Sequence, residues 1–335
     1  MPTAFEYGLT NLEFSGAEVT FLPSGWQRDK MTFNFKNVTC ILQHSSDYKE
    51  ILKELCETHG AAVTATLALV CEDDMSKEAA DDLADAICEL LAFATKNTVF
   101  WVTRELIAPG VAKKGFTRSL AGRARNFHSG WAIISDYVST SSGLRAELHT
   151  FLGAVIEHYV DALRCKLRTS LLWINESQHH HFVDLRFMSL YIGIERLRID
   201  FLPKSKRNYI HAGWQELLDG DLAREILAAI EAKTGPLSPE QQKNLISQLR
   251  SANNPSAGLL LEELCEGLGV TGLEKDMGIL RNSLVHRASY GNFEFSKVRN
   301  LEKKLSHVVD VCVLKILGYD GYYCHEDTDW KNTKL

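Results

Sequence analysis

The sequence lacks the cysteine spacing of a zinc or redox site. None of its eight cysteines belongs to a Cys-x-x-Cys pair, and most lie within apolar periodic segments. Cysteines in that setting are typical of buried thiols in a reducing compartment, which predicts a cytoplasmic protein. Dinucleotide-binding, Walker A and nucleophile-elbow motifs are also missing. We therefore expect no metal ion and no cofactor.

Long apolar runs and linker-like stretches are absent too. No window approaches the roughly 18 to 20 apolar residues that a membrane-spanning helix needs. Residues 1–10 have no basic region followed by an apolar run, so we expect no signal peptide and no membrane partner. Proline is scarce, with 7 residues, which argues against a long disordered linker. With 335 residues, 45% hydrophobic and 24% charged, the chain has the composition of a globular protein of two domains.

The chain has no excess of positive charge, since its net charge is -6. A protein that binds nucleic acid over a broad surface is usually basic, so any RNA contact has to be a local patch. Two clusters are candidates for binding RNA phosphates. Their residues are Lys113, Lys114, Arg118, Arg123 and Arg125 in the first cluster, and Lys204, Lys206 and Arg207 in the second. A solvated loop is the alternative for the first cluster, and a cluster that complements a helix dipole is the alternative for the second.

Residues 1–138 have a β-rich pattern. Runs of β-branched and aromatic residues predict strands at 18–22, 31–35, 38–42, 61–70 and 98–102. Residues 76–94 instead have apolar residues at helical spacing behind Ser76, a suitable N-cap. Residues 107–134 have the pattern of a loop, and residues 131–137 predict a last strand. Nothing in this domain points to a particular chemistry.

Residues 139–335 have helical patterns throughout. Helices are predicted at 144–172, 182–201, 209–232, 238–249, 256–268, 273–287 and 296–317. Their short connections are typical of an all-α bundle. The predicted fold class is therefore α+β, with a β-rich domain over residues 1–138 and a helical bundle over residues 139–335.

One segment of the predicted bundle carries residues suited to chemistry on RNA. Residues 280–286, Leu-Arg-Asn-Ser-Leu-Val-His, lie in the predicted helix 273–287. Asn282 and His286 are four apart and share a face, whereas Arg281 and His286 are roughly 140° apart around an ideal helix. A long Arg side chain can reach across, or a second copy of the helix can complete the cluster. The alternative is that both residues are merely exposed at a helix end, where the dipole favours cations.

Spacing alone does not identify this segment, because Arg123 and His128 have the same spacing. That second pair lies in a stretch without helical periodicity, and Ala124 follows its Arg where Asn282 follows Arg281. Context therefore favours the pair in the helix.

The motif in its helical context resembles the HEPN superfamily, which carries an Arg and a His separated by four to six residues late in a helical bundle. The Apea-like branch is most similar, because an acidic residue in an apolar setting precedes the motif helix there, and Glu195 occupies the matching position. The resemblance covers residues 140–320. It implies a HEPN-type bundle, a homodimer with a composite site, and an endoribonuclease of bacterial antiviral or toxin type. The implied partners are RNA, with tRNA as a candidate target, and a regulatory protein or phage-derived trigger.

The chemistry implied by the resemblance needs no metal ion. RNA supplies its own nucleophile, the 2′-OH, so cleavage needs a group that moves a proton and a cation that stabilises the phosphorane. His286 suits the first role and Arg281 the second, while Asn282 orients the imidazole or donates to the phosphate. The expected products are a 2′,3′-cyclic phosphate and a 5′-hydroxyl.

Several assignments stay open on the sequence. Glu195 can pair with Arg281 and orient it, or with Arg198 on its own helix. The run of His179, His180 and His181 suits a metal, but a solvent-exposed loop is the alternative that we favour. The bundle can also be a non-catalytic module that binds RNA or a nucleotide. In a third interpretation, the N-terminal domain carries a regulatory function.

Overall fold

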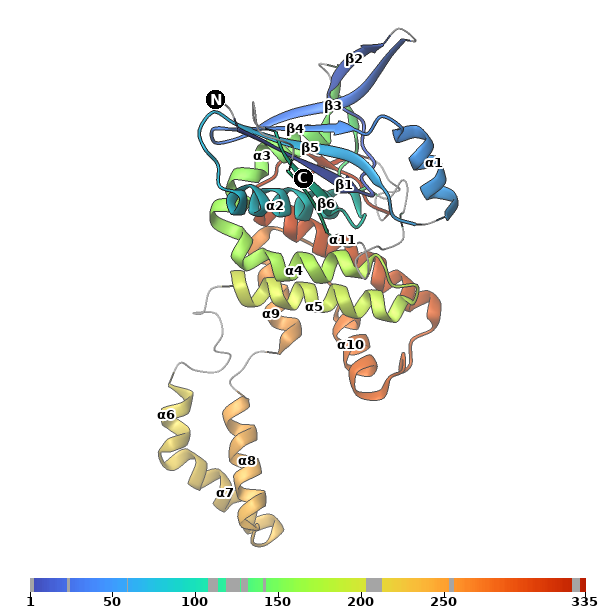
Figure 1. The fold of residues 1–335 in the computed structure, drawn as a ribbon. Helices are drawn as coiled ribbons and strands as arrows, with labels where there is room; N and C mark the ends of the chain where they lie inside the picture. The colour runs from blue at the N-terminus through green and yellow to red at the C-terminus, as the bar shows by residue number, and fades with distance from the viewer. Residues whose placement is uncertain are drawn as a thin grey trace.

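The chain folds into an antiparallel sheet followed by a helical region, which confirms the predicted α+β class (Figure 1). The structure is a computed structural model that describes residues 3–22, 25–58, 60–107, 114–118, 127, 132–140, 143–202, 213–252, 256–326 and 332–335. Within these ranges, no helix combines the length and the apolar content needed to cross a membrane.

The main sheet has seven strands in the order β2-β3-β4-β5-β1-β6-β7, and every neighbouring pair is antiparallel. The strands are β1 (Thr3–Thr10), β2 (Glu18–Leu22), β3 (Gly25–Phe35), β4 (Val38–His44), β5 (Val63–Cys71), β6 (Trp101–Ile107) and β7 (Lys114–Thr117). Two hairpins are formed by β8 (Tyr137–Thr140) with β9 (Gly143–Ala146) and by β10 (Tyr322–Tyr323) with β11 (Thr333–Lys334). Helix α1 (Tyr48–Thr58) connects β4 to β5.

One face of the sheet is buried because apolar residues alternate along its central strands. Tyr7 is opposite Leu67 across the β1–β5 pair, and Leu67 is opposite Leu42 across the β4–β5 pair. All three side chains are buried, and such alternation is expected of an antiparallel sheet with one covered face. Helix α2 (Lys77–Thr95) packs on this face, with buried alanines that allow a close approach. Its predicted N-cap is confirmed, since the Ser76 side chain accepts from the Ala79 N–H.

The long helix predicted after the sheet is three consecutive helical segments. They are α3 (Glu147–His158), the π-helical turn η1 (Tyr159–Leu163) and α4 (Arg164–Ser177). The Tyr159 hydroxyl donates to Glu89 Oε2 at 2.7 Å, and Arg164 Nε donates to the same oxygen at 2.9 Å. The π turn therefore lies where two side chains reach one carboxylate of α2.

Helices α5 and α11 form the centre of the bundle. Helix α5 (Val183–Phe201) packs against α4, and α11 (Phe295–Ile316) packs against α5. Helices α9 (Ala257–Leu268) and α10 (Lys275–Arg287) lie against both of them. One hydrophobic core is continuous from the sheet through α2 and α3 to these helices.

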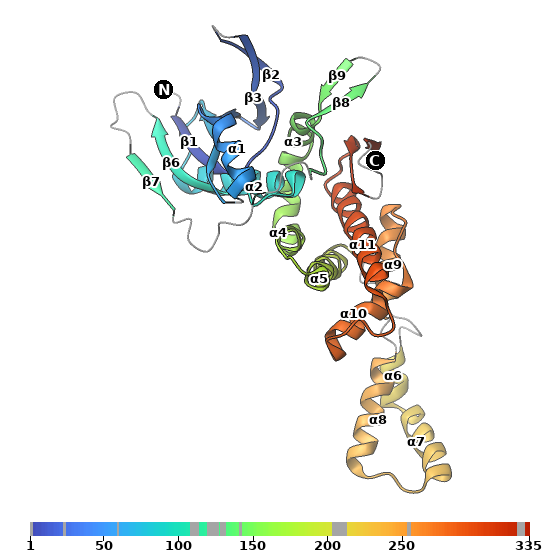
Figure 2. The ribbon, with the colours of Figure 1, turned by 90° about the vertical axis from the view of Figure 1, so that its right-hand side faces the viewer.

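Three further helices project from the bundle (Figures 1 and 2). They are α6 (Trp214–Asp219), α7 (Asp221–Thr234) and α8 (Pro239–Ser251). Within this group only Leu218 and Ala223 are buried. Trp214 Nε1 donates to the Leu249 carbonyl at 2.8 Å, which holds α6 against α8.

A group of buried charged residues connects the sheet half to the helical half. Lys96 follows α2 in the left-handed region, with a φ of 56°, and its Nζ lies 2.7 Å from Asp310 Oδ1 on α11. Their side chains are 5% and 1% exposed, so the ion pair is shielded from water. Nearby, Arg186 Nη2 on α5 donates to Glu302 Oε2 on α11 at 3.2 Å.

Some local predictions were wrong. The loop predicted over residues 107–134 contains β7, a short edge strand stabilised by pairing with β6. The described part of the last predicted strand, residues 132–136, forms no strand. Instead, the Ile133 and Ile134 N–H groups donate to the Ala94 carbonyl at 2.8 and 3.2 Å. The helix predicted over residues 209–232 is interrupted at Gly220, between α6 and α7.

Several elements were not predicted, namely β1, α1 and the short strands β9, β10 and β11, of which β9 lies where the helix predicted over residues 144–172 begins. Strand β1 lies in the middle of the sheet, where Phe5, Tyr7 and Leu9 alternate with less apolar residues. Helix α1 is strongly amphipathic but has only Leu55 buried. The apolar alternation of β1 and the amphipathic pattern of α1 were both present in the sequence.

We expect Gly193→Ala to destabilise the fold, because an added Cβ would lie 2.9 Å from Ile174 Cγ1 between α4 and α5. Overpacking of this kind costs about 1–3 kcal/mol. The matched control is Gly153→Ala at an exposed position of α3. No atom lies within 4 Å of the added Cβ there, and removing the helical glycine stabilises by about 0.5–1 kcal/mol. Urea unfolding measures the change in unfolding free energy of both variants. Equal changes would contradict the close packing of α4 against α5.

The buried Glu302 predicts a specific pH dependence of stability. Burial raises its pKa above the ordinary value of 4.5 in the folded state, although the Arg186 charge acts in the opposite direction. As pH rises from below 4.5, the unfolded chain therefore loses its proton first, and the folded state loses relative stability until Glu302 also ionises. Over that pH window, the unfolding free energy of the wild type should fall relative to that of Glu302→Gln. A pH-independent difference would show that this carboxylate is not perturbed.

Candidate functional site

Helices α5 and α10 bring Arg281 and Glu195 together. Met277 and Leu280 anchor α10 in the bundle, so Arg281 lies on the side of α10 that faces α5. Its Nη2 lies 3.7 Å from Glu195 Oε1, and its Nη1 donates to the Asn282 side-chain oxygen at 3.2 Å. No ion pair joins Glu195 to Arg198 among the described residues. Of the two partners open to Glu195 on the sequence, the structure therefore brings Arg281 to it.

The phenol ring of Tyr191 forms a wall beside this ion pair. Tyr191 is buried on α5, one turn before Glu195, and Arg281 Cζ lies 5.9 Å from its ring centroid. Burial, followed by the charge of Glu195, raises the pKa of Tyr191, so its hydroxyl stays protonated. The guanidinium is thus restrained by a carboxylate, an amide and an aromatic ring. Its Nε is buried without a hydrogen-bond partner in the described part of the chain.

His286 lies in a different environment from Arg281. It is exposed in the last turn of α10, which ends at Ala288 in the left-handed region. Within the described ranges, it makes no hydrogen bond or ion pair. Helical geometry turns it roughly 140° away from Arg281. A single chain therefore orients the guanidinium but leaves the imidazole at the surface.

The outer face of α10 combines polar and apolar side chains. Ile279 and Val285 are each 48% exposed, and Asn282 and His286 are exposed beside them. These four residues recur at helical spacing on the side opposite the buried Met277 and Leu280. The motif residues Asn282 and His286 are thus bordered by apolar surface.

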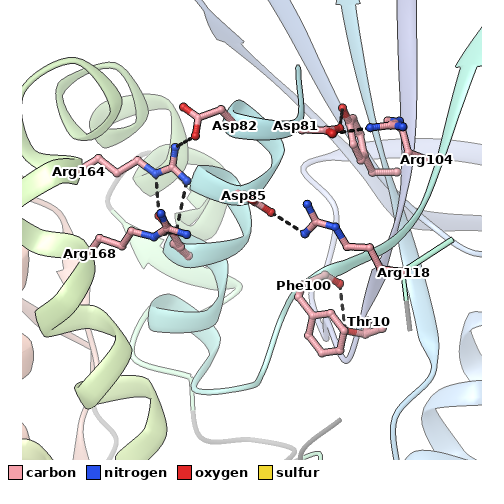
Figure 3. A network of polar contacts seen from close by, with 11 residues as sticks. Thr10, Asp81, Asp82, Asp85, Phe100, Arg104, Arg118, Arg164 and Arg168 are labelled. Carbon is pink, nitrogen blue, oxygen red and sulfur yellow. Dashed lines mark hydrogen bonds and ion pairs between the residues drawn. The ribbon is translucent and has the colours of Figure 1, made fainter. Parts of the chain in front are cut away.

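Of the first basic cluster, Arg118 is the residue whose side chain is described. Figure 3 shows it directed toward Asp85 of α2, with Nη1 3.2 Å from Asp85 Oδ1. Its Cζ also lies 3.3 Å from the Trp101 ring centroid. This guanidinium is therefore paired with a carboxylate within the fold.

The other basic candidates are less completely described. Lys114 begins β7, where the structure describes its backbone alone. The remaining six lie outside the described residues, namely Lys113, Arg123, Arg125, Lys204, Lys206 and Arg207. The alternative motif residue His128 also lies outside them.

The carboxylates of α2 form a network that the sequence analysis missed (Figure 3). Asp81 pairs with Arg104 of β6, and Asp82 Oδ1 lies 2.6 Å from Arg164 Nη1 of α4. Arg164 and Arg168 both reach Glu89, at 2.9 and 2.8 Å. Acidic residues at helical spacing on α2 were a visible signal, but their partners come from distant strands and helices.

The described residues contain no group of three or more His, Cys, Asp or Glu side chains that could hold a metal ion. In the histidine run, His179 Nε2 lies 2.6 Å from Thr98 Oγ1. That contact ties the α4–α5 connection to the segment before β6. His179 lies in a connection between two helices and also makes a tertiary contact with Thr98.

No family model, curated protein or solved structure was found to match this chain.

We expect Arg281 and Glu195 to be energetically coupled. Both side chains are partly exposed, at 29% and 22%, so solvent screening limits the coupling to about 0.5–1 kcal/mol. A double-mutant cycle with Arg281→Ala and Glu195→Ala, followed by urea unfolding, measures it. The matched control is Arg224 with Asp221 on α7, at 82% and 78% exposure, where coupling near zero is expected. Equal coupling in the two cycles would remove the evidence for a pre-oriented Arg281.

Proposed function

We propose that this protein is an endoribonuclease that cleaves RNA without requiring a metal ion. The observation that carries the proposal is the orientation of Arg281 by Glu195, at 3.7 Å, on the helix that also presents His286. A guanidinium held by a carboxylate is pre-oriented for a phosphate. The HEPN resemblance supports the same assignment.

The proposed reaction uses the RNA's own 2′-OH. A neutral imidazole removes the 2′-OH proton, and the 2′-oxygen attacks the adjacent phosphorus. The bond to the 5′-oxygen breaks, and an imidazolium gives that oxygen a proton. Arg281 stabilises the charge on the phosphorane, and Asn282 donates to a phosphate oxygen or orients the imidazole. The products are a 2′,3′-cyclic phosphate and a 5′-hydroxyl.

A homodimer is part of the proposal, because one chain does not direct Arg281 and His286 to a common point. A second copy seated on the outer face of α10 would cover Ile279 and Val285, and its own motif helix would face this one. Two symmetry-related histidines would then supply the base and the acid. An isologous contact of this kind is the commonest form of self-association.

The biological setting follows from the resemblance alone. We propose cleavage of cellular RNA, with tRNA as a candidate, in a bacterial antiviral or toxin system. In that setting the β-rich region, residues 1–138, senses a trigger, selects the RNA or restrains the helical bundle. A regulatory protein or a phage-derived molecule would be the trigger.

A non-catalytic module that binds RNA or a nucleotide is the second candidate. The specific observation in its favour is His286, which has no orienting partner among the described residues. This candidate predicts binding without cyclic-phosphate ends, and Arg281→Ala would weaken that binding more than His286→Ala does.

We expect His286→Ala and Arg281→Ala each to lower RNA cleavage by at least about 100-fold, the usual contribution of a proton-transfer group or an oxyanion donor. The assay is cleavage of extracted RNA with sequencing and chemical mapping of the new ends. Arg287→Ala is the matched control, because it removes an exposed charge from the same turn of α10 outside the motif. It should cleave at close to the wild-type rate.

Each variant has to retain the wild-type circular dichroism spectrum and elution volume. Under that condition, full activity in His286→Ala would refute the proposed chemistry. Binding without cleavage by the wild type would favour the non-catalytic module.

A further inference from the structure

A cavity of about 270 Å³ lies where the sheet half meets the bundle, and it is distinct from the α10 motif. We call it the junction cavity. Its wall is formed by Lys96 after α2, Arg186 near the start of α5, the first half of α11, and residues 324–326. Segments that are far apart in the sequence therefore meet around one small space.

The wall of the junction cavity is positively charged although the protein as a whole is acidic. Its lining contains the cations Lys96, Arg186, Arg299 and Lys303 and the carboxylates Glu302 and Glu326. With Asp310, which pairs with Lys96, the group has four cations and three carboxylates, a net charge of +1 against -6 for the whole chain. Such a local field attracts anions.

Three of the four cations are held in fixed positions by carboxylates. Lys96 lies 2.7 Å from the buried Asp310, Arg186 donates to Glu302, and Lys303 contacts Glu326. Arg299, one turn before Lys303 on α11, forms no ion pair within 4 Å among the described residues, although its charge acts on Glu302. The cations are therefore held in place before a ligand binds, and the Arg299 guanidinium can donate to that ligand.

Two buried atoms of this array also lack hydrogen-bond partners in the described part of the chain. Arg186 Nε is a donor in that state. Asp310 Oδ2 is an acceptor, which an anion cannot satisfy, and it lies 3.7 Å from His325 Nε2. Buried polar atoms without partners are costly, and they are uncommon unless a ligand or water completes them.

We propose that the junction cavity is a binding site for a small phosphate-bearing ligand. Arg299, Arg186 and Lys303 would contact the phosphate, because guanidinium groups donate to phosphate oxygens in a matched fork. Its volume admits inorganic phosphate or a ligand about as large as a nucleoside monophosphate. The proposal is independent of nuclease activity.

The test is calorimetric titration of the full chain with inorganic phosphate and with AMP, at constant ionic strength set by sodium chloride. We expect saturable binding of at least one of them, with one ligand per chain. Binding of phosphate alone identifies the free anion as the ligand. Tighter binding of AMP than of phosphate identifies a nucleotide. Adenosine should not bind.

Two variants locate the site. Arg299→Gln and Lys303→Gln should each weaken binding about tenfold or more, the loss expected for one charge-assisted contact. Lys315→Gln is the matched control, because it removes one exposed charge from the same helix outside the cavity. It should bind as the wild type does, and all three variants should keep the wild-type melting temperature within a few degrees.

Four results would overturn the proposal. The first is no saturable binding of either ligand, and the second is wild-type affinity in both Arg299→Gln and Lys303→Gln. The third is equal weakening by Lys315→Gln, which would indicate non-specific attraction. The fourth is binding of adenosine as tightly as AMP, which would show that the phosphate is not recognised.

Discussion

Helix α2 lies between the sheet and the first helices of the bundle, so its partly buried carboxylates need cationic partners. One face packs small and branched apolar residues against β1 and β6, and the remainder carries five carboxylates. Asp81 and Glu89 are 23% and 19% exposed, so leaving either without a partner would be costly. Asp81 meets a guanidinium from β6 (Figure 3). Glu89 meets two guanidinium groups from α4. Because these arginines come from opposite sides of α2, the network orients the bundle against the sheet.

That orientation reaches the candidate site through packed helices. Helix α4 packs against α5, and α5 carries both Tyr191 and Glu195, which restrain Arg281 on α10. The side chain of His286, in contrast, has no such restraint in the described part of the chain, because it is exposed in the last turn of α10. One chain thus orders the phosphate-binding half of the proposed site, and the proposed dimer accounts for the other half.

Local charge and net charge give different information about this molecule. The chain is acidic overall, yet cations gather at the junction cavity, where Lys96 and Arg186 approach α11 from two other segments. Net charge sums over the whole surface, whereas an anion responds to the field of the groups within a few ångströms of it. Arg118 is the opposite case, because it lies in a run of cations in the sequence but pairs with Asp85 in the fold.

The sequence by itself determined the α+β class and the positions of most helices. Apolar periodicity is a local property, and signals such as Ser76 before α2 and Ser238 before α8 act within one turn. It also singled out Arg281, Glu195 and His286 as candidates. Only the tertiary structure decided that Glu195 meets Arg281, that Ile133 and Ile134 cap α2 instead of forming a strand, and that Lys96 pairs with Asp310 across 214 positions. The physical reason is that side-chain pairing depends on which helices and strands pack together, and that choice is made by the whole core at once.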